Sequence, residues 1–599
     1  MSSSKVIFSV YIQVSRLWGH LGSRRKKQLA LLGLLTLLVS FAEVVSIGAV
    51  VPFLSAFSSQ GQVSDYQILR PVMQALQIQA NQSALLFFTL IFVFASITAG
   101  ILRITLIWAQ TRLSISIGAD FSVKVYELTL YQSYASHLKR NTSETLAGSQ
   151  KANNLVSHII QPILNILSSL FVLVVVIFTL FSIQPAITIS AFLGFAIIYY
   201  LLVLITKRQI VKNSQVISMQ QGRVIKAVQE GLGGIRDVLI DGTQQVYSRV
   251  YRDAFYPMRL ATSYNQVLGA SPRFGIEALG MVLIAVLAYM FSYENKNISV
   301  GVNASIPMLG VLALGVQRLL PLLQLIYTSY IQIKGNENNI QDAIELLDQD
   351  LPNNHLYIEP LIFQEKIWLK NLGFKYNLYE PWIFRNINLE IPKGSRFGFI
   401  GSTGSGKSTL LDVVMGLLDP TEGGFFIDGY SICPKNIRAW QSHISHVPQS
   451  VYLADASIAE NIAFGIPYEK IDLDRVKKSA EQAKLSKLIE GLGQGYSTLV
   501  GERGVRLSGG QRQRIGIARA LYKRANVIIF DEATSALDSE TEEEVMLSIE
   551  ALGREITILI IAHRLTTLRN CDLIYKLDNG GIYLVGDYKN KIKEKIFSR

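Results

Sequence analysis

Residues 401–408 read Gly-Ser-Thr-Gly-Ser-Gly-Lys-Ser, which is the spacing of a loop that binds phosphate groups. The apolar run 397–400 predicts a strand before this loop, and residues 409–415 predict a helix after it. In that position the glycines let backbone N–H groups surround phosphate oxygens at the N-terminus of the helix. Lys407 would then reach the β- and γ-phosphates of a nucleotide, and Ser408 would coordinate Mg²⁺.

Two carboxylates, Asp531 and Glu532, follow the apolar run 527–530, which predicts a strand. Asp531 would hold the Mg²⁺ shell, and Glu532 would orient or deprotonate the attacking water. An acidic pair after a strand can also be a helix N-cap. With the glycine-rich loop upstream, we favour a site that hydrolyses a nucleotide.

A third motif, Leu-Ser-Gly-Gly-Gln at residues 507–511, precedes an arginine-rich helical segment. This motif resembles the signature of ABC transporters, and the resemblance extends over the whole soluble half. It implies that Tyr376 stacks on adenine, that Gln449 forms the Q-loop and that residues 535–538 form the D-loop. It also implies that His563, which follows the apolar run 556–562, is the switch histidine.

The resemblance implies ATP and Mg²⁺ as cofactors, and it assigns a role to each matching residue. The implied catalytic residues are Glu532, His563, Lys407 and Gln449. The implied ATP contacts are Tyr376, Gly401, Ser402, Thr403, Gly404, Ser405, Gly406, Lys407, Ser408, Thr409, Ser508, Gly509, Gly510, Gln511 and Asp538. The implied metal ligands are Ser408, Gln449 and Asp531.

In that family, the signature of one chain caps the γ-phosphate of ATP bound to another, which a helix N-terminus can do through its N–H groups. Two ATP-binding domains must therefore close on two ATP molecules. A homodimer is the simplest expectation, because one chain supplies six spans and one such domain. A heterodimer with a similar chain is the alternative.

The first half of the chain, which precedes these motifs, is rich in long apolar stretches. Six apolar stretches lie near residues 29–54, 84–109, 161–184, 186–205, 275–293 and 305–331. Each is long enough to span a bilayer as a helix, the structure that satisfies every backbone polar group within its own segment. Basic residues at 24–27 and in the segments after the second and fourth stretches place both termini in the cytoplasm. A cleaved signal peptide is a less favoured reading of the first stretch.

The predicted fold is an α-helical membrane bundle of six transmembrane helices, of the ABC exporter type, followed by an α/β P-loop nucleotide-binding domain. We expect a cytoplasmic or interfacial N-terminal helix at 1–28 and a transmembrane domain with long cytoplasmic helical extensions at 29–335. A linker at 336–360 and an ABC ATP-binding domain at 361–599 would follow. The turns at 143–148 and 230–236 could contact the ATP-binding domain, or they could be ordinary interhelical loops.

The net charge of +12 does not indicate nucleic acid, because much of the basic excess lies between the apolar stretches, where the positive-inside rule explains it. The two cysteines, Cys433 and Cys571, both fall in the soluble half and indicate no disulfide framework.

Residues 43–54 and 318–321 resemble the corresponding segments of bacterial lipid-linked oligosaccharide flippases. This resemblance implies export of a polar-headed lipid across a bacterial inner membrane. Arg103, Arg273 and Arg318 lie in or at the ends of apolar stretches, and they could bind a pyrophosphate or acidic headgroup. Alternatively, they pair with Glu43 or Glu277 and hold helices together. A multidrug or hydrophobic-peptide exporter is the second candidate, and a non-transporting ATPase or an ATP-gated channel is less favoured.

Overall fold

The computed structural model describes residues 15–58, 82–139, 154–183, 185–294, 298–349, 361–377, 379–532, 539–550, 553–562 and 565–586. The chain divides into two compact units. One comprises Met1–Gln132 and Lys139–Leu351, and the other comprises Ser133–Leu138 and Pro352–Arg599. Each unit is described below by itself.

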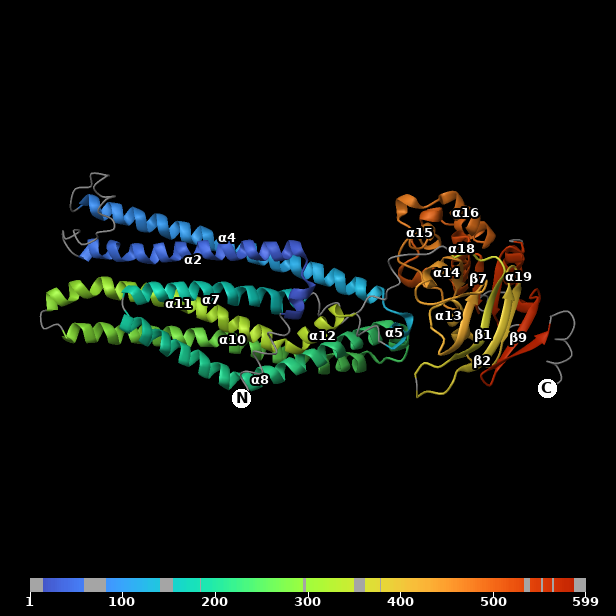
Figure 1. The fold of residues 1–599 in the computed structure, drawn as a ribbon, viewed down its shortest axis with the longest axis horizontal. Coiled ribbons are helices and arrows are strands. Elements are labelled where there is room, and N and C mark those ends of the chain that lie inside the picture. Colours follow the sequence, from blue (N-terminus) through green and yellow to red (C-terminus); the bar gives the residue numbers. More distant parts are fainter. Residues whose placement is uncertain are drawn as a thin grey trace. The chain divides into compact units, whose positions relative to one another are not determined.

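The first unit consists of long helices (Figure 1). They are α2 (Ser23–Ser58), α4 (Gln82–Leu130), α7 (Gln161–Ile183), α8 (Pro185–Gly233), α10 (Gln244–Glu294) and α11 (Ile298–Gly335). A π-helical turn, η2 (Val156–Ile160), leads into α7, and short helices follow at α9 (Ile235–Ile240) and α12 (Glu337–Leu347). Residues 15–20 form one further helical segment. Helix α2 packs against α4 and α7, whereas α8 packs against α10.

The described residues of all six predicted spans lie in these helices; residue 184, the last of the third span, is not described. Within the described residues, four helical segments have the length and apolar composition needed to cross a membrane: Ser23–Leu54, Leu85–Leu130, Val156–Ser182 and Phe192–Gly233. The fifth and sixth predicted spans lie inside α10 and α11. Helix α4 has 49 residues, so at 1.5 Å per residue it is about 70 Å long, more than twice what a bilayer core requires.

The segment expected to be a linker begins with a packed helix. In α12, Ile340, Ile344 and Leu347 are buried in one cluster with Ile117 and Phe121 of α4. These three α12 residues recur at three- and four-residue spacing, so they form one apolar face of the helix. The first half of residues 336–360 is therefore part of the core of the helical unit.

The second unit contains two sheets. The four-stranded antiparallel sheet has the order β2-β1-β4-β5, and the six-stranded sheet has the order β10-β9-β3-β8-β7-β6. The strands are β1 (Lys366–Phe374), β2 (Phe384–Pro392), β3 (Arg396–Ile400), β4 (Glu422–Ile427), β5 (Tyr430–Ser431), β6 (Ile444–Val447), β7 (Val527–Asp531), β8 (Thr557–Ile561), β9 (Leu573–Asp578) and β10 (Gly581–Gly586). Strands β6, β7, β8, β3 and β9 run parallel, and β10 pairs antiparallel with β9.

The parallel sheet separates two apolar cores. Along β7, Ile528 and Phe530 face one core, whereas Val527 and Ile529 face the other. This alternation follows the two-residue period of a strand, and burial of both faces explains why β7 is a continuous apolar run. The carboxyl ends of the parallel strands consequently meet at one edge of the sheet, where the phosphate loop and the acidic pair both lie.

Helices pack on both faces of this sheet. They are α13 (Lys407–Val414), α14 (Ile437–Ser442), α15 (Ile458–Ile462), α16 (Leu473–Gln482), α17 (Ser486–Glu490), α18 (Gly509–Lys523) and α19 (Ser539–Glu550). Helix α5 (Tyr134–Lys139) comes from the first half of the chain, yet residues 133–138 belong to this unit and Ala135 packs against its core. The expected contact turn at 143–148 lies outside the described residues, and residues 230–236 form the end of α8 and the start of α9.

Candidate ATP-binding site

The predicted phosphate loop connects β3 to α13, and the helix begins at Lys407, two residues before its predicted start. Gly406 caps this helix with a left-handed φ of 91°, and a Cβ there would lie 2.7 Å from Cγ2 of Ile383. A Cβ on Gly401 would lie 2.4 Å from the carbonyl oxygen of Leu577. Both positions therefore favour glycine, because Gly406 has a left-handed φ and packs against the Ile383 side chain, and Gly401 lies against backbone.

Lys407 lies inside the loop, with 7% of its surface exposed. Its ammonium group donates hydrogen bonds to the carbonyl oxygens of Gly401 at 2.9 Å and Ser402 at 3.0 Å. The hydroxyl of Ser405 is buried and has no hydrogen-bond partner among the described residues. A buried cation and an unsatisfied donor in one loop suit an anionic ligand such as a phosphate group.

The acidic pair lies at the end of β7. The N–H group of Glu532 donates to the carbonyl oxygen of Ile561 at 3.0 Å, and Glu532 has a positive φ of 50°. Such a backbone conformation is uncommon for a residue with a side chain, and it turns the carboxylate away from the line of the strand. The side-chain amide of Gln449 donates to Glu532 at 2.7 Å, so two predicted catalytic residues are in direct contact.

Oxygen ligands for a divalent cation lie beside this pair. The hydroxyl of Ser408 donates to the carboxylate of Asp531 at 3.5 Å. The carboxyl group of Asp412 is close by, and burial together with the charge of Asp531 raises its pKa to about 6. No group of three or more His, Cys, Asp or Glu side chains suited to a metal occurs in the described part of the chain. Mg²⁺ needs few protein ligands when phosphates and waters complete its shell, so Ser408 and Asp531 fit it.

The predicted adenine contact is a half-exposed aromatic ring. Tyr376 shares a hydrogen bond of 3.2 Å with the hydroxyl of Thr409, and its ring lies edge-on to Phe374 at 5.0 Å between centroids. Tyr134 of α5 lies near Asp412 and Tyr376. Burial, together with these two neighbours, raises the pKa of Tyr134. We did not predict Asp412 or Tyr134. Asp412 could have been found, since it follows Ser408 by one helical turn, but no local signal connects Tyr134 to residues more than 200 positions away.

The signature motif begins α18. The hydroxyl of Ser508 accepts from the N–H of Gln511 at 3.2 Å, and the Gln511 side chain accepts from the N–H of Ser508 at 2.9 Å. This capping box leaves the N–H groups of Gly509 and Gly510 at the helix N-terminus, where no intrahelical acceptor precedes them. No hydrogen bond or ion pair between described residues joins 508–511 to the phosphate loop. One chain therefore presents two separate halves of the predicted ATP contacts.

Two predicted elements of the site lie outside the described residues. They are the switch histidine, His563, and the D-loop 535–538 with its nucleotide-binding Asp538. Their roles remain predictions.

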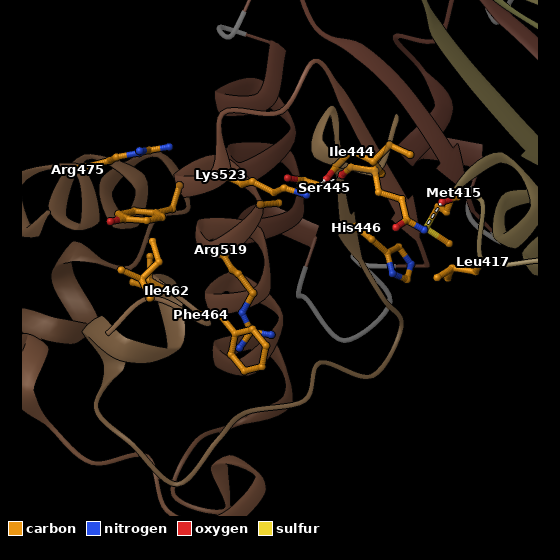
Figure 2. A pocket seen from close by; sticks show the side chains of 14 residues that line it. Met415, Leu417, Ile444, Ser445, His446, Ile462, Phe464, Arg475, Arg519 and Lys523 are labelled. Carbon is orange, nitrogen blue, oxygen red and sulfur yellow. Dashed lines mark hydrogen bonds between the residues drawn. The ribbon is translucent and has the colours of Figure 1, made fainter. Parts of the chain in front are cut away.

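A groove of about 590 Å³ lies elsewhere on the ATP-binding unit (Figure 2). Its apolar surface includes Met415, Leu417, Ile462 and Phe464. Basic side chains from α18 and α16 line it as well: Arg519, Lys523 and Arg475. The Arg519 guanidinium lies 4.4 Å from the centre of the Phe464 ring, and burial lowers its pKa to about 10. Burial also lowers the pKa of Lys523. Three cationic side chains line the groove, so it favours a partner with acidic groups.

The predicted substrate residues lie in the helical unit. Glu43 of α2 is 3% exposed, and its carboxylate lies 2.7 Å from the guanidinium of Arg318 and 3.6 Å from that of Arg103. The structure thus contains the pairing that the sequence left open for these two arginines. Arg273 is exposed on α10 and Glu277 is half-buried, and neither forms an ion pair with another described residue.

Comparisons with known proteins agree with this architecture. The profile of the ABC transporter family matches residues 384–535. The ATP-dependent lipid A-core flippase of Cupriavidus pinatubonensis is 30% identical over 74% of this chain and 75% of its own length. The flippase of the same name from Alkalilimnicola ehrlichii is 33% identical over 63% of each protein, so the chain spans less than two thirds of that relative.

A solved structure has the same fold over most of the chain. A bacterial Atm1-family ABC exporter with ATP bound superposes with a TM-score of 0.76 over 94% of this chain and 95% of its own, at 22% identity. The predicted fold class and family are therefore confirmed. The family match implies ATP binding, and the apolar helices together with the flippase relatives indicate a membrane-embedded protein. The chain belongs to the ABC transporter family, as an exporter-type half-transporter with one helical membrane unit and one ATP-binding unit.

Proposed function

We propose that two copies of the chain form an ATP-driven flippase for a polar-headed lipid, such as a lipid-linked oligosaccharide or a glycolipid. The membrane would be a bacterial inner membrane, with both termini and the ATP-binding domain in the cytoplasm. Relatives named lipid A-core flippases support lipid flipping in general. The headgroup has to be inferred from the chain's own residues.

The main support for this proposal is the excess of positive charge around Glu43. One buried carboxylate contacts two guanidinium groups, so the three side chains together carry a formal charge of +1 among apolar helices. An uncompensated charge at this depth is costly unless it faces water or an anionic partner. Arg103 is the looser contact, at 3.6 Å and with 36% of its side chain exposed. It is the group best able to leave Glu43 for a ligand.

The ligand that suits these residues is a phosphate or pyrophosphate headgroup. A guanidinium binds such a group through two parallel hydrogen bonds, which fixes its orientation as well as its charge. Arg318 would stay on Glu43 and hold the two helices together, while Arg103 turns to the headgroup. Arg273 is exposed and would provide a further contact during passage.

The ATP-binding unit would supply the energy. Lys407, the loop N–H groups and Tyr376 would bind ATP, and Ser408, Asp531 and Gln449 would hold Mg²⁺, which neutralises charge on the phosphates. Glu532, held by Gln449, would orient and deprotonate the attacking water. Residues 508–511 of the second chain would donate N–H groups to the γ-phosphate, with Asp538 and His563 completing the site. Closing two such sites would switch the membrane cavity from inward to outward.

The second copy also has a candidate docking site. Helix α9 exposes Leu239 and Ile240, whose surfaces are 60% and 71% accessible, next to the exposed acids Asp237 and Asp241. Arg236 is exposed on the same helix, so the segment has one basic and two acidic side chains. Its apolar tip and net negative charge complement the groove around Phe464, which is apolar and basic. We infer that α9 of one copy docks in this groove of the other, so that each ATP-binding unit is moved by a partner's helices.

The lipid proposal is tested by ATPase activity in lipid nanodiscs with lipid-linked saccharides, glycolipids or hydrophobic drugs. We expect a pyrophosphate-linked saccharide lipid to stimulate turnover, and Arg103→Ala to remove the stimulation while keeping the basal rate. Arg112→Ala is the matched control, because Arg112 lies on the same helix but stacks on Trp108 at 5.2 Å. Stimulation by drugs alone would replace this proposal with the multidrug exporter.

The docking proposal is tested with two differently tagged copies, one carrying Leu239→Cys and the other Phe464→Cys. A disulfide between the two tags can form only between chains, since each engineered cysteine is on a different copy. Tyr583→Cys, exposed on β10, replaces Phe464→Cys in the control pair. Cross-linking that is equally efficient in both pairs would reject this docking site.

A further inference from the structure

We propose that the N-terminal segment latches the start of the connection to the ATP-binding unit, with Asp348 as the positioning residue. The latch consists of Arg16 and His20 on helix 15–20, Lys124 on α4 and Asp348 at the end of α12. Residues on three elements meet in this one polar cluster, and Arg16 and His20 lie 332 and 328 positions from Asp348 in the chain. This inference rests on the transport function proposed above.

Asp348 receives hydrogen bonds from two side chains of the N-terminal segment. The Nε of Arg16 donates to one carboxylate oxygen at 2.8 Å, and the terminal nitrogen of Arg16 contacts the same oxygen. The ring Nε2 of His20 lies 2.6 Å from the other oxygen. Both oxygens are thus engaged, and charge-assisted bonds of this kind are stronger than those between neutral groups.

His20 extends the cluster to α4. Its second ring nitrogen, Nδ1, lies 3.1 Å from the ammonium of Lys124, which can only donate. Nδ1 must therefore accept, and Nε2 carries the proton that it donates to Asp348. A neutral ring with this tautomer joins a cation on α4 to a carboxylate on α12. Arg25 adds a second connection, because its guanidinium donates to Asp120 of α4 at 2.7 and 3.1 Å.

An apolar contact supports the polar one. Leu17 lies between Arg16 and His20 in sequence, is 6% exposed and belongs to the cluster that buries Ile344 and Leu347 of α12. We expected residues 1–28 to form a cytoplasmic or interfacial helix. Of its apolar residues, Leu17 packs into protein and Trp18 is half-exposed, whereas Ile7, Val10, Tyr11 and Val14 lie outside the described residues.

The position of Asp348 explains why the latch would matter. Asp348 is the C-cap of α12, and the residues after it lead toward Pro352, where the ATP-binding unit resumes. Helix α12 packs on α4 and α8, two long helices of the membrane unit. When the latch holds its C-terminal end, α12 transmits a movement of the residues that follow Asp348 to α4 and α8. Without the latch, its last turn can unwind and absorb the displacement.

The test uses the full chain in proteoliposomes, with hydrogen exchange and transport measured on the same variants. Asp348→Asn should speed exchange of the last turn of α12 by about tenfold. It should also lower transport of a fluorescent pyrophosphate-linked saccharide lipid per ATP hydrolysed by about fivefold, with the basal ATPase rate unchanged. Glu345→Gln is the control, because Glu345 is exposed on the same helix and its partner is Gln341 on that helix.

Charge exchange separates a latch from a general packing defect. Arg16→Asp combined with Asp348→Arg should recover much of the protection and of the coupling that either single change removes. Unchanged exchange in Asp348→Asn would overturn the latch. Faster exchange with unchanged transport per ATP would overturn its role in coupling. If the unmodified protein shows no lipid-dependent ATPase activity, the flippase proposal fails and the coupling role with it, while the exchange experiment still decides whether the latch exists.

Discussion

The side-chain amide of Gln449 donates a hydrogen bond of 2.7 Å to the carboxylate of Glu532, 83 positions further along the chain. The two residues meet because β6 and β7 are adjacent parallel strands, with Val447 opposite Phe530. Both strands end at the same edge of the sheet. Gln449 lies two residues after the end of β6, and Glu532 lies one residue after the end of β7. Two residues after Gln449, Val451 enters the core formed by α15 to α18. Gln449 therefore connects the reacting edge of the sheet to the helices that carry the signature.

Glu532→Gln should lower ATP turnover by about 10² to 10⁴-fold, the effect of removing a positioned general base. Binding of ATP should persist, because the phosphate loop is untouched. Turnover is measured by phosphate release and binding by a fluorescent ATP analogue. Glu390→Gln is the control, since Glu390 forms a surface ion pair with Lys366 on the far sheet. Normal turnover in Glu532→Gln would remove Glu532 from the mechanism.

Gln449→Ala should lower kcat by roughly 10- to 100-fold, as expected for the loss of a hydrogen bond to a charged group that orients the water. KM for ATP should change by much less, because Gln449 does not contact the phosphate loop in this structure and Ser408 and Asp531 remain to hold Mg²⁺. Steady-state kinetics at saturating Mg²⁺ separate the two parameters. Gln494→Ala, at an exposed position, is the control. A rise in KM without a fall in kcat would mean that Gln449 serves binding instead.

Asp412→Asn should stabilise the protein at high pH. The pKa of Asp412 is raised to about 6, above its ordinary 3.8, so the uncharged form favours folding at acid pH and this contribution is lost as the pH rises through about 6. Asparagine cannot ionise. We expect the free energy of unfolding to rise by about 1 kcal/mol at pH 8 and to stay the same at pH 4, after allowance for partial exposure.

This prediction is checked by thermal unfolding of the full chain without nucleotide or Mg²⁺ at both pH values. Asp419→Asn, at an exposed position just beyond α13, is the control. An equal gain in stability at pH 4 and pH 8 would show that ionisation of Asp412 is not the cause.

Gly118→Ala should destabilise the helical unit by roughly 1–3 kcal/mol, the range for overpacking a tight contact. A Cβ at Gly118 of α4 would lie 1.6 Å from Cγ2 of Val156 in the π-helical turn η2. Gly100→Ala is the matched control on the same helix, because a Cβ there meets nothing within 4 Å. Thermal unfolding in detergent compares the two, and Val156→Ala should rescue Gly118→Ala. Equal midpoints for the two glycine variants would contradict the close approach.

Local motifs predicted much of the ATP-binding edge. The phosphate loop, the acidic pair and the signature each depend on a few consecutive residues, and the strands and helices around them follow from short apolar runs. Contacts between distant segments could not be predicted in this way. The choice of Arg318 as the partner of Glu43, 275 positions away, depends on how α2 and α11 pack. The sequence offered Glu43 and Glu277 as equivalent partners, and packing distinguished them.

Helix α5 has six residues and belongs to a unit that otherwise begins at Pro352. The core against which Ala135 packs includes Leu577, and Ile582 packs against the same core. At about 5–20 residues per second, a ribosome needs roughly 20–90 s to synthesise the approximately 440 residues between α5 and Leu577. A six-residue helix is not stable alone in water, so α5 cannot be stably helical until the residues that it packs against have been synthesised. The core that Ala135 contacts is therefore complete only after Leu577 has been synthesised, so α5 cannot be fully buried in the order of synthesis.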